Sequence, residues 1–474
     1  TRAALMFVTG RFALLVALGA IPVVIWPSGW TVVAWAAGAF FVMLCDVVLA
    51  GPTTAVAVSR AKTAPIRLGE HTTTQLSVVN SSRRRYRGRL RDAWQPSAGA
   101  GADSRDRRPV REPGFYTDLA RRWEELRLQV SGDPAPPGPL SNRRDLNLAP
   151  EERQFFDVGL QPTRRGDRLA IRLTLRRNGP LGLAGRQRSL FLPGAVRALP
   201  AFDSRKHLPS RLASLRQLDG RSAVRTRGQG TEFDSLRDYV EGDDVRSIDW
   251  RATARRRSTV VRTWQPERDR HVVLVLDTSR TSAGRIGDQP RLDAAMDAAL
   301  LLAALASHAG DRIDFIAGDR VIHKKVRATR RVNLLNEMVT AMAPLESALL
   351  EADWGLLGAE VTRTVSQRAL VVLLTPLEPS AIAESLLPTL AVLAQRYQVV
   401  IASVSDPELD EMLAGRGDTS SSYRAAASAR TLTQREDTAT VLARLGVMVI
   451  DRGPEDLPPA LADHYLSLKS RGLL

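Results

Sequence analysis

Charged and apolar side chains alternate in the stretch from Gly228 to Arg256, which reads GQGTEFDSLRDYVEGDDVRSIDWRATARR. Arginine forks that face carboxylates form bidentate hydrogen bonds with strict geometry. We therefore expect Arg237, Arg246 and Asp249 to make fixed ion pairs, and Trp250 to be buried between two neighbouring domains. The alternative is a solvated loop, whose surface ion pairs stabilise a fold very little.

A second candidate is the carboxylate that ends the apolar run His271–Asp277, HVVLVLD. A continuous apolar run is typical of a buried parallel strand, and ligands of doubly wound sheets bind beyond the carboxyl ends of the strands. Asp277, Ser279 and Thr281 would place one carboxylate and two hydroxyls at such an end. Oxygen ligands of this kind suit a hard cation such as Mg²⁺. The alternative is that Asp277 and Ser279 only cap the following turn.

Sequence patterns of several enzyme classes are absent. The GQG at 228–230 lacks the Gly-Lys-Ser/Thr ending of a phosphate-binding loop. His271, His308 and His323 do not have the spacing of a zinc site on one helix, and no G-x-S-x-G nucleophile motif occurs. Cys45 is the single cysteine, which excludes an intramolecular disulfide and a cysteine-based metal site. We therefore expect no catalytic residues and no enzyme, with a hydrolase as a distant alternative.

The elements that would position Asp277 lie from residue 263 onward, where short apolar runs alternate with helical periodicity. The predicted strands are His271–Asp277, Arg312–Ala317, Arg320–Val326, Ala369–Thr375, Val399–Val404 and Val447–Ile450. A helix is predicted over Arg291–Ala309, and further helices lie between the later strands. This alternation predicts an α/β domain over residues 263–474 with a doubly wound, Rossmann-like sheet.

Residues 53–200 predict a small antiparallel β-sandwich, because short runs with period-two alternation are separated by turn residues. The runs are Thr73–Val79, Tyr86–Arg91, Phe155–Gln161 and Leu169–Leu175. A flexible insertion is predicted near 97–145 from its Gly, Ala, Ser, Asp and Arg content, with a short amphipathic helix over Leu119–Val130. Residues 201–262 form a connector that includes the charged stretch.

Residues 1–52 predict a transmembrane hairpin, because two apolar runs, Phe12–Trp26 and Trp30–Ala50, flank a turn. The second has the ~20 residues that a crossing requires, and the first is short unless Arg11 snorkels. A cleaved signal peptide for the first run, or two buried helices of a soluble domain, are the alternatives. Basic residues flank both ends of the hairpin, so the positive-inside bias places both termini and the soluble domains in the cytoplasm. Asp46 is predicted to reach water at the interface rather than to relay protons.

The net charge of +16 is unevenly placed along the chain. Residues 53–200 carry 28 Lys and Arg against 14 Asp and Glu, whereas residues 263–474 carry 23 against 27. The arginines between 83 and 91 could indicate nucleic-acid binding, but only Tyr86 lies among them and no nucleic-acid-binding motif is present. Contact with an anionic membrane surface is the better explanation, at about 1 kcal/mol per nearby basic side chain. We therefore expect no specific nucleic-acid partner.

The charged stretch also resembles the signature of the domain-of-unknown-function family numbered 58. The resemblance extends to Arg165-Gly166, to Pro180–Leu183 and to Asp277. It implies a membrane-anchored protein with a von Willebrand factor A-like domain, commonly associated with MoxR-type AAA+ ATPases. The matching residues that we expect to be structural are Gly230, Glu232, Phe233, Arg237, Tyr239, Gly242, Asp243, Asp244, Arg246, Asp249, Trp250 and Arg255.

A von Willebrand A-like domain in turn implies a metal-ion-dependent adhesion site. Asp277, Ser279 and Thr281 resemble the opening of that site, and Thr329 is placed like its second-loop threonine. The third loop should bring an aspartate, but this chain reads Thr-Pro-Leu-Glu at 375–378. We therefore expect a degenerate site that binds Mg²⁺ weakly or not at all, unless Glu378 supplies the missing oxygen.

Together these features predict a membrane-tethered interaction or scaffold protein. Its cytoplasmic A-type domain would work with a MoxR-type AAA+ ATPase in the assembly or remodelling of a protein complex, whose client protein the sequence does not identify. Binding of an anionic polymer or of the membrane surface through the basic domain is the alternative.

Overall fold

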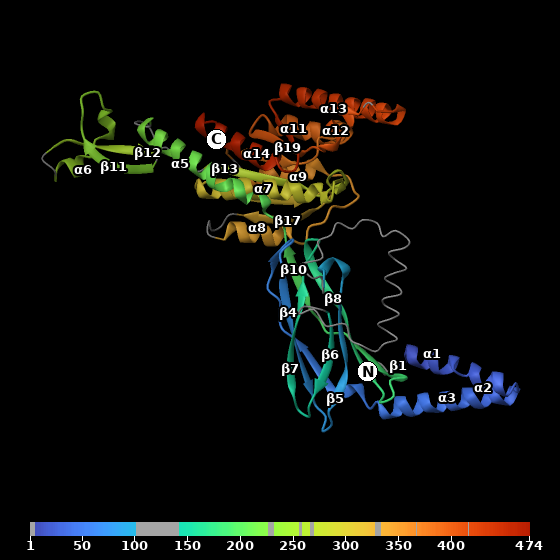
Figure 1. The fold of residues 1–474 in the computed structure, drawn as a ribbon. Helices are drawn as coiled ribbons and strands as arrows, with labels where there is room; N and C mark the ends of the chain where they lie inside the picture. The colour runs from blue at the N-terminus through green and yellow to red at the C-terminus, as the bar shows by residue number, and fades with distance from the viewer. Residues whose placement is uncertain are drawn as a thin grey trace. The chain divides into compact units, whose positions relative to one another are not determined.

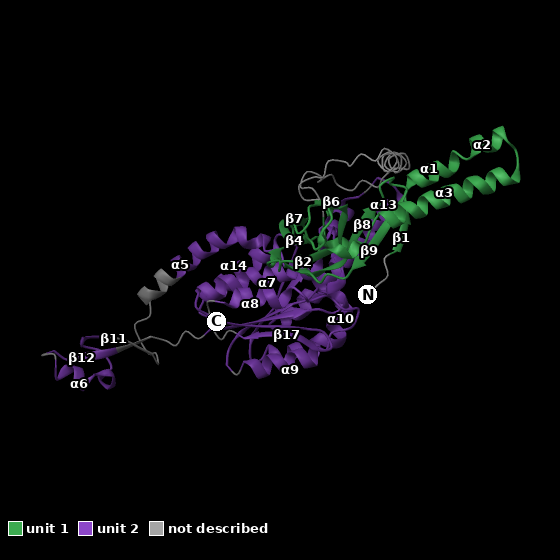
Figure 2. Ribbon diagram, turned by 90° about the horizontal axis from the view of Figure 1, so that it is seen from below, with its two compact units in different colours: residues 1–199 green, residues 200–474 purple. Residues whose placement is uncertain are grey.

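The computed structural model describes residues 5–100, 142–225, 232–255, 258–265, 270–327, 333–365, 367–415 and 417–474. The fold is mixed α/β (Figure 1). The chain divides into two compact units, residues 1–199 and 200–474, which are coloured separately in Figure 2. The helix predicted over Leu119–Val130, and most of the insertion predicted near 97–145, lie outside the described residues.

Unit 1 begins with a short strand and an apolar helical hairpin. The elements are β1 (Leu5–Val8), α1 (Gly10–Ala17), α2 (Ala20–Ile25) and α3 (Gly29–Leu49). Within the described part of the chain, the helix that starts at Gly29 is the one long and apolar enough to cross a membrane, with a mean hydropathy of 2.3. The apolar segment Gly10–Ile25 is shorter. One membrane-spanning candidate is therefore found where the sequence predicts two.

The two arms of the hairpin contact each other around Trp35. Trp35 Nε1 donates to the carbonyl oxygen of Leu15 at 3.2 Å. A Cβ placed on Gly19 would lie 2.4 Å from Trp35 Cδ1, so a larger residue at this position would push the two arms apart. The outward side chains are large and apolar; Val24 and Trp30, for example, are 80% and 81% exposed. An uncovered apolar surface of this kind is typical of a segment that contacts lipid or a partner.

Two sheets make up the rest of unit 1. The larger sheet has seven strands, in the order β1-β9-β8-β10-β3 with β5 joined to β8 and β6 joined to β5, and the smaller has the order β2-β4-β7. All pairings are antiparallel except that of β10 with β3. The bounds are β2 (Val56–Arg60), β3 (Ile66–Arg67), β4 (Thr72–Asn80), β5 (Tyr86–Trp94), β6 (Arg143–Leu148), β7 (Arg153–Leu160), β8 (Gly166–Asn178), β9 (Ala184–Leu190) and β10 (Ala195–Leu199), with 3₁₀ turns at Thr53–Ala55 and Pro96–Ala98.

Buried residues alternate with exposed ones along β4 and β5, as expected for strands with one face in a core. One hydrophobic cluster draws on both sheets, with Leu76 and Val158 from the smaller and Leu90 and Leu173 from the larger. The two sheets of unit 1 therefore share a core.

Asp46 joins the hairpin to the larger sheet, and the prediction that its carboxylate reaches water at the interface is wrong. Its carboxylate is fully buried and accepts three backbone N–H groups, from Leu181 and Leu183 at 2.8 Å and from Ala184 at 2.9 Å. Asp46 therefore does not reach water at an interface. The turn between β8 and β9 folds over the carboxylate and gives it the donors that water would otherwise supply.

Unit 2 opens with a connector that leads to a two-stranded hairpin. The connector consists of a 3₁₀ turn at Asp203–His207 and α5 (Leu208–Arg225). Ser204 binds the buried carboxylate of Asp297 through both its amide, at 3.1 Å, and its hydroxyl, at 2.8 Å. The hairpin pairs β11 (Glu232–Asp238) with β12 (Val260–Gln265), and its loop contains a 3₁₀ turn at Val245–Ser247 and α6 (Trp250–Thr253).

The rest of unit 2 is built on a six-stranded sheet with the order β17-β16-β13-β18-β19-β20, parallel except at β17. Its strands are β13 (His271–Asp277), β16 (Arg312–Gly318), β17 (Ile322–Arg327), β18 (Leu370–Leu374), β19 (Gln398–Val404) and β20 (Met448–Arg452). The helices are α7 (Arg291–His308), α8 (Leu334–Met342), α9 (Trp354–Thr364), α10 (Pro379–Ala381), α11 (Leu387–Leu393), α12 (Glu408–Ala414), α13 (Thr419–Arg444) and α14 (Leu457–Ser470). A 3₁₀ turn at Arg280–Ala283, the strand pair β14 (Arg285–Ile286) and β15 (Gln289–Pro290), and a π-helical turn at Ile382–Leu386 complete it.

Helices cover the sheet on both sides. Helix α7 is buried nearly all round, because it contacts the sheet as well as α5, α8 and α14. On the other face a core cluster joins alternate residues such as Val273 and Val371 to α9, α11 and α13. From β13 the chain passes first to β16 on one side and later to β18 on the other. A change of direction of this kind opens a crevice at the carboxyl ends of the strands.

Candidate functional site

Asp277 is the last residue of β13 and lies at this crevice, 1% exposed. Its Oδ1 accepts the backbone N–H of Ser279 at 2.8 Å. Its Oδ2 accepts the hydroxyls of Thr281 at 3.0 Å and of Thr375, which directly succeeds β18, at 2.7 Å. Ser279 Oγ lies 3.0 Å from Thr281 Oγ1. The fold thus gathers one carboxylate and three hydroxyls at the ends of two neighbouring parallel strands.

Burial of this cluster disfavours the charged form of the Asp277 carboxyl group. Burial raises the pKa of Asp277, and the hydrogen bonds from Ser279, Thr375 and Thr281 oppose that rise. A metal ligand has to be deprotonated, so any cation would bind against this preference.

The space beside Asp277 is a cavity of about 10 Å³, lined by Ser279, Thr281, Thr375 and Pro376 among others. That volume accommodates roughly one water molecule. The second carboxylate on its lining, Glu351, is half exposed and forms an ion pair with Arg280.

A complete set of metal ligands is not found. The described residues contain no group of three or more His, Cys, Asp or Glu that could hold a metal ion. Glu378, the expected substitute ligand, does not line the cavity, and Thr329 lies outside the described residues. The oxygen donors are therefore of the kind that Mg²⁺ prefers, but a single buried carboxylate does not make the acidic set that such a site needs.

A neighbouring carboxylate, Asp319, fixes the loop between β16 and β17. Its Oδ2 accepts the hydroxyl of Thr278 at 3.1 Å and lies 2.8 Å from His323 Nε2, and its Oδ1 accepts the amide of Val321. Burial opposes ionisation of Asp319, but the hydrogen bonds from His323 and Val321 outweigh it and lower the pKa of Asp319. Asp319 was not among the predicted site residues, although it directly follows the apolar strand β16.

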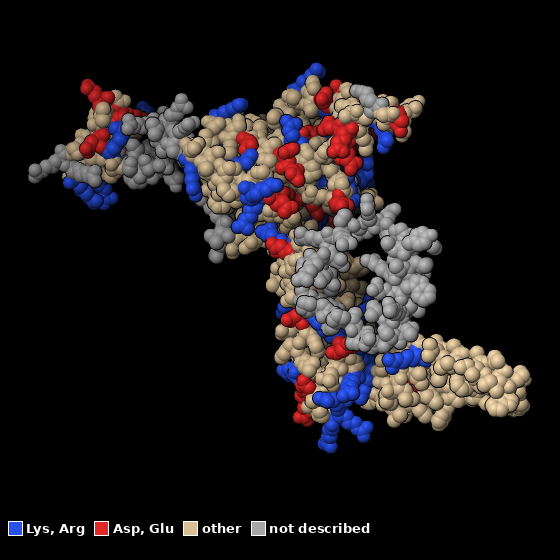
Figure 3. All heavy atoms as spheres, in the orientation of Figure 1, with Lys and Arg blue, Asp and Glu red and all other residues tan. Residues whose placement is uncertain are grey.

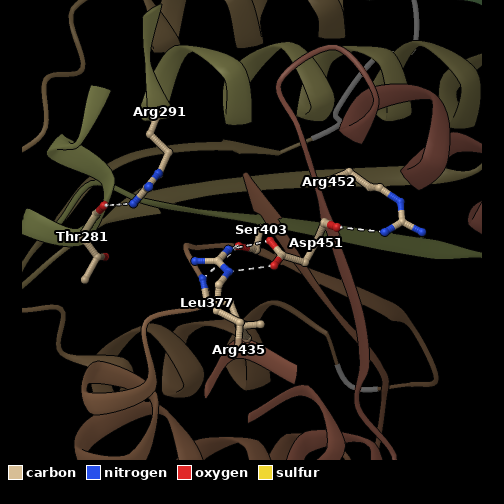
Figure 4. A network of polar contacts seen from close by, with 7 residues as sticks. All are labelled: Thr281, Arg291, Leu377, Ser403, Arg435, Asp451 and Arg452. Atoms are coloured by element: carbon tan, nitrogen blue, oxygen red, sulfur yellow. Dashed lines mark hydrogen bonds and ion pairs between the residues drawn. The ribbon is translucent and has the colours of Figure 1, made fainter. Parts of the chain in front are cut away.

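An arginine network lies at the carboxyl ends of β19 and β20 (Figure 4). Arg435 of α13 reaches Asp451 with two hydrogen bonds, at 2.9 and 2.6 Å, and Ser403 at 3.1 Å. Ser403 Oγ also accepts the amide of Leu377, so the network connects α13 to three neighbouring strand ends. The sequence analysis missed these residues. A usable signal was that Asp451 follows the apolar run Val447–Ile450, as Asp277 follows its own run.

The signature carboxylates of the β11–β12 hairpin bind mainly backbone N–H groups. Asp243 accepts the amide of Val240 at 3.0 Å, and Asp244 accepts that of Arg246 at 3.0 Å. Asp249 caps α6 by accepting two amides, from Arg251 at 3.0 Å and Ala252 at 2.9 Å. Carboxylates at such positions satisfy donors that a turn or a helix start leaves free. They therefore hold the loop in one conformation.

Two arginines add ion pairs to this loop. Arg237 binds Asp243 at 2.5 Å, and Arg262 binds Asp249 at 2.9 Å. The hydrogen bond from Arg237 lowers the pKa of Asp243, and that from the Ala252 amide, followed by Arg262, lowers the pKa of Asp249. Both pairs are part-exposed, so the expected ion pairs of Arg237 and Asp249 are present but not buried. Among the described residues Arg246 makes no ion pair, and only its backbone N–H binds Asp244.

Trp250 contradicts its prediction. Its side chain is 67% exposed, and Val240 and Val245 of the same loop are 61% and 60% exposed. The loop is held in its conformation by polar groups that bind its own backbone, and not by its apolar side chains. The signature therefore presents large apolar groups outward.

Most of the remaining signature residues shape or close the same loop. Gly242 has a φ of +106°, which favours glycine, directly before Asp243. Tyr239 donates its backbone N–H to the Thr259 carbonyl across the base of the loop, and Arg255 donates its own to the Ala252 carbonyl at the end of α6. Glu232 and Phe233 begin β11, and Gly230 lies outside the described residues.

Comparison with known proteins shows a match to a protein family over part of the chain. Residues 235–441, which include most of the signature, Asp277 and Arg435, match the family described as "Protein of unknown function DUF58". The family prediction is thereby confirmed over these residues. No curated protein matches the chain.

Two solved structures show weak likenesses to the chain. The VWA domain of SpRpn10 has 12% identity and a TM-score of 0.26, and the match covers 41% of this chain and 94% of that one. The PapD-like domain 7 of human CEP192 has 13% identity and a TM-score of 0.18, over 32% of this chain and 89% of that one. Likenesses with scores this low assign neither a binding partner nor an activity to the chain.

Proposed function

We propose that this protein is a membrane-anchored interaction protein that docks a partner protein through the loop between β11 and β12. The observation that carries the proposal is the exposure of Val240, Val245 and Trp250 on a loop whose backbone is fixed by carboxylates. Tryptophan is enriched among the residues that dominate binding energy in interfaces. A loop that is already ordered loses little conformational entropy when it binds.

The partner proposed is a MoxR-type AAA+ ATPase, which the family resemblance implies. With it we propose that unit 2 contains a von Willebrand factor A-like domain and that residues 53–200 form a β-sandwich. The opposed faces of the six-stranded sheet and the core shared by the two sheets of unit 1 support these assignments. The site at Asp277 is proposed to be a degenerate adhesion site, so docking would not require metal.

The anchor is proposed to be a hairpin of two spanning segments with both ends in the cytoplasm. The length of α3, 21 residues or about 32 Å, matches the ~30 Å hydrocarbon core. Ser28, exposed at the turn, would then face the outside. Ser28→Cys in a Cys45→Ala background should be labelled by an impermeant thiol reagent added to intact cells. Labelling only after the cells are opened would contradict this topology.

Docking is tested by capture of the ATPase with the full-length chain in nanodiscs. Trp250→Ala should weaken capture roughly 30-fold or more if Trp250 contributes at least ~2 kcal/mol, as dominant interface residues do. Tyr423→Ala, which removes a 74% exposed aromatic side chain from α13 of the same unit, is the matched control and should bind normally. Equal capture by Trp250→Ala and the unsubstituted chain would refute the docking loop. Capture that persists in chelator is expected as well.

A further inference from the structure

One face of the larger sheet of unit 1 carries a concentration of arginines. Tyr86 and Leu90 of β5 point into the core, so the alternate residues of that strand point outward. The same alternation applies to Arg143 in β6 and to the part of β8 after residue 171. The exposed arginines on this face are Arg87, Arg89, Arg91, Arg143, Arg172 and Arg176.

These side chains are close enough to repel one another. Arg89 is paired directly with Arg176 across β5 and β8, and Arg91 with Arg143 across β5 and β6. Burial and then the charges of Arg91, Arg143 and Arg89 lower the pKa of Arg176. Asp145 is the one acidic side chain among the described residues on this part of the face, and it pairs with Arg89. On this part of the face the described residues thus include six arginines and one acidic side chain, so positive charge is in excess there.

The arginine face lies next to the base of the hairpin. Strand β1, which leads into α1, pairs with β9, and the buried end of α3 is bound to β9 through Asp46 and through Arg186 Nε, which donates to the Val47 carbonyl at 3.2 Å. Strand β8 is the next strand and β5 the one after, so at about 5 Å per strand the arginines begin about 5–10 Å from β9. Figure 1 shows the hairpin leaving unit 1 on the side of β5, β6 and β8, and Figure 3 shows basic side chains beside its almost uncharged surface.

Because the neighbouring hairpin is apolar, the charged surface nearest to these arginines would be the headgroups of a membrane. If α3 spans the bilayer, its last turn, where Asp46 binds the turn between β8 and β9, lies at the headgroups. Side chains within ~8–10 Å of the headgroups interact with them before salt screens the attraction. Phe7 of β1, over which Arg176 stacks at 5.2 Å, adds an aromatic ring at the same level.

We propose that this arginine face binds the headgroups of anionic phospholipids in the leaflet from which α3 emerges, an inference that rests on the membrane anchoring of the proposed function. The hairpin supplies attachment, and the face holds unit 1 against the bilayer in one orientation. Each guanidinium offers a planar set of donors that matches phosphate oxygens.

The test uses the full-length chain in nanodiscs of phosphatidylcholine alone or of an equal mixture with phosphatidylglycerol. A fluorophore is attached through Thr174→Cys, between the arginines on β8, in the Cys45→Ala background. A trace of lipid with a nitroxide on its headgroup quenches the fluorophore on contact. The control position is Gln75→Cys, exposed on β4 of the smaller sheet.

We expect quenching at Thr174→Cys to be greater in the anionic discs and to fall to the neutral level in ~0.5 M salt. Replacing Arg87, Arg91 and Arg172 by Gln should abolish the difference between lipids. Replacing Lys62, Arg153 and Arg164 by Gln, which removes the same charge from exposed positions elsewhere in unit 1, should preserve it. All six positions are exposed, so folding should be unaffected, and the Gln75→Cys fluorophore should not respond to lipid charge.

Equal quenching in both lipids, or a difference that survives the Arg87, Arg91 and Arg172 replacement, would overturn the inference. So would a response of the Thr174→Cys fluorophore to an RNA or DNA oligonucleotide but not to anionic lipid, since the face would then bind nucleic acid. Extraction of the chain from membranes by alkaline carbonate checks the anchor separately. Release would overturn the anchoring and this inference together, whereas retention with equal quenching would overturn the inference alone.

Discussion

Replacing Asp46 by Asn tests the strongest link between the hairpin and the rest of unit 1. The substitution keeps the size of the side chain and removes one acceptor oxygen. The remaining oxygen can keep the amides of Leu183 and Ala184, which both bind Oδ2. The new NH₂ group then faces the amide of Leu181, and two donors oppose each other in a fully buried site.

The expected magnitude comes from that geometry. A hydrogen bond to a charged group contributes about 1.5–3 kcal/mol, and a buried donor left without a partner costs about 1–3 kcal/mol. Since these contributions overlap, Asp46→Asn should reduce the free energy of unfolding of unit 1 by roughly 3–5 kcal/mol. Asp157→Asn, at an exposed carboxylate of β7, is the matched control and should cost about 0.5 kcal/mol or less.

The assay is thermal unfolding of the full chain in nanodiscs, with limited proteolysis of the 179–184 turn as a local readout. Gly179→Ala provides an independent route to the same result, because its Cβ would lie 2.1 Å from Asp46 Oδ1 without changing any polar group. Both variants should melt earlier and be cleaved faster at the turn. An Asp46→Asn variant that melts with the unsubstituted chain would refute the reasoning and show that the carboxylate is not needed to hold the turn.

Three further predictions concern unit 2. Trp250→Ala should leave the melting temperature of the chain nearly unchanged, since the ring is 67% exposed; a large drop would show that the ring is buried in solution. Burial raises the pKa of Asp297 to about 6, above the ~3.8 of the unfolded chain. The contribution of Asp297 to the free energy of unfolding is therefore most favourable below pH ~4 and is lost as pH rises towards 6. Asp297→Asn should therefore be more stable than the unsubstituted chain at pH 7, by up to roughly 3 kcal/mol, and lose that advantage at pH 4, as melts across this range would show; a constant difference would contradict the assignment. Millimolar Mg²⁺ should not shift the melt, whereas a rise that disappears in Asp277→Ala would restore a working metal site, since saturation at ~100 times the dissociation constant stabilises by about 2.7 kcal/mol.

The elements of the α/β part of unit 2 could be predicted because each carries its own signal. The run HVVLVLD gave the bounds of β13 as His271–Asp277, and the predicted helix over Arg291–Ala309 is α7, Arg291–His308. A continuous apolar run of this length is stable only as a strand covered on both faces. The order of the strands could not be predicted, because nothing in β18 itself says that it pairs with β13 rather than with β17.

The candidate site was predictable only in part, because part of it depends on the order of the strands in the sheet. Ser279 and Thr281 follow Asp277 within four residues, so chain geometry alone brings them to its carboxylate. Thr375 is a donor to Asp277 across 98 positions of sequence, and Arg435 reaches Asp451 from a different helix. Such contacts depend on which strands become neighbours.

Trp250 shows where reasoning from residue type fails. A tryptophan among apolar residues suggested burial, but the loop is held by hydrogen bonds to its backbone N–H groups instead. Asp249 satisfies the amides at the start of α6 and also binds Arg262, so the turn is held without help from the indole. An ordered loop that does not need its largest apolar side chain for stability leaves that side chain available to a partner.

Pro180–Leu183, to which the sequence resemblance was predicted to extend, lies in unit 1 and outside the matched residues 235–441. Three amides at or directly after this motif bind Asp46, which lies about 135 residues earlier in the last turn of α3. The carboxylate therefore fixes the angle at which α3 leaves the larger sheet. In the proposed membrane arrangement, that angle would decide which face of the sheet meets the bilayer, and the outward face of β5, β6 and β8 carries the six arginines. If the proposed anchoring holds, the acid buried at the end of this apolar helix would be the condition for the basic surface to meet the membrane.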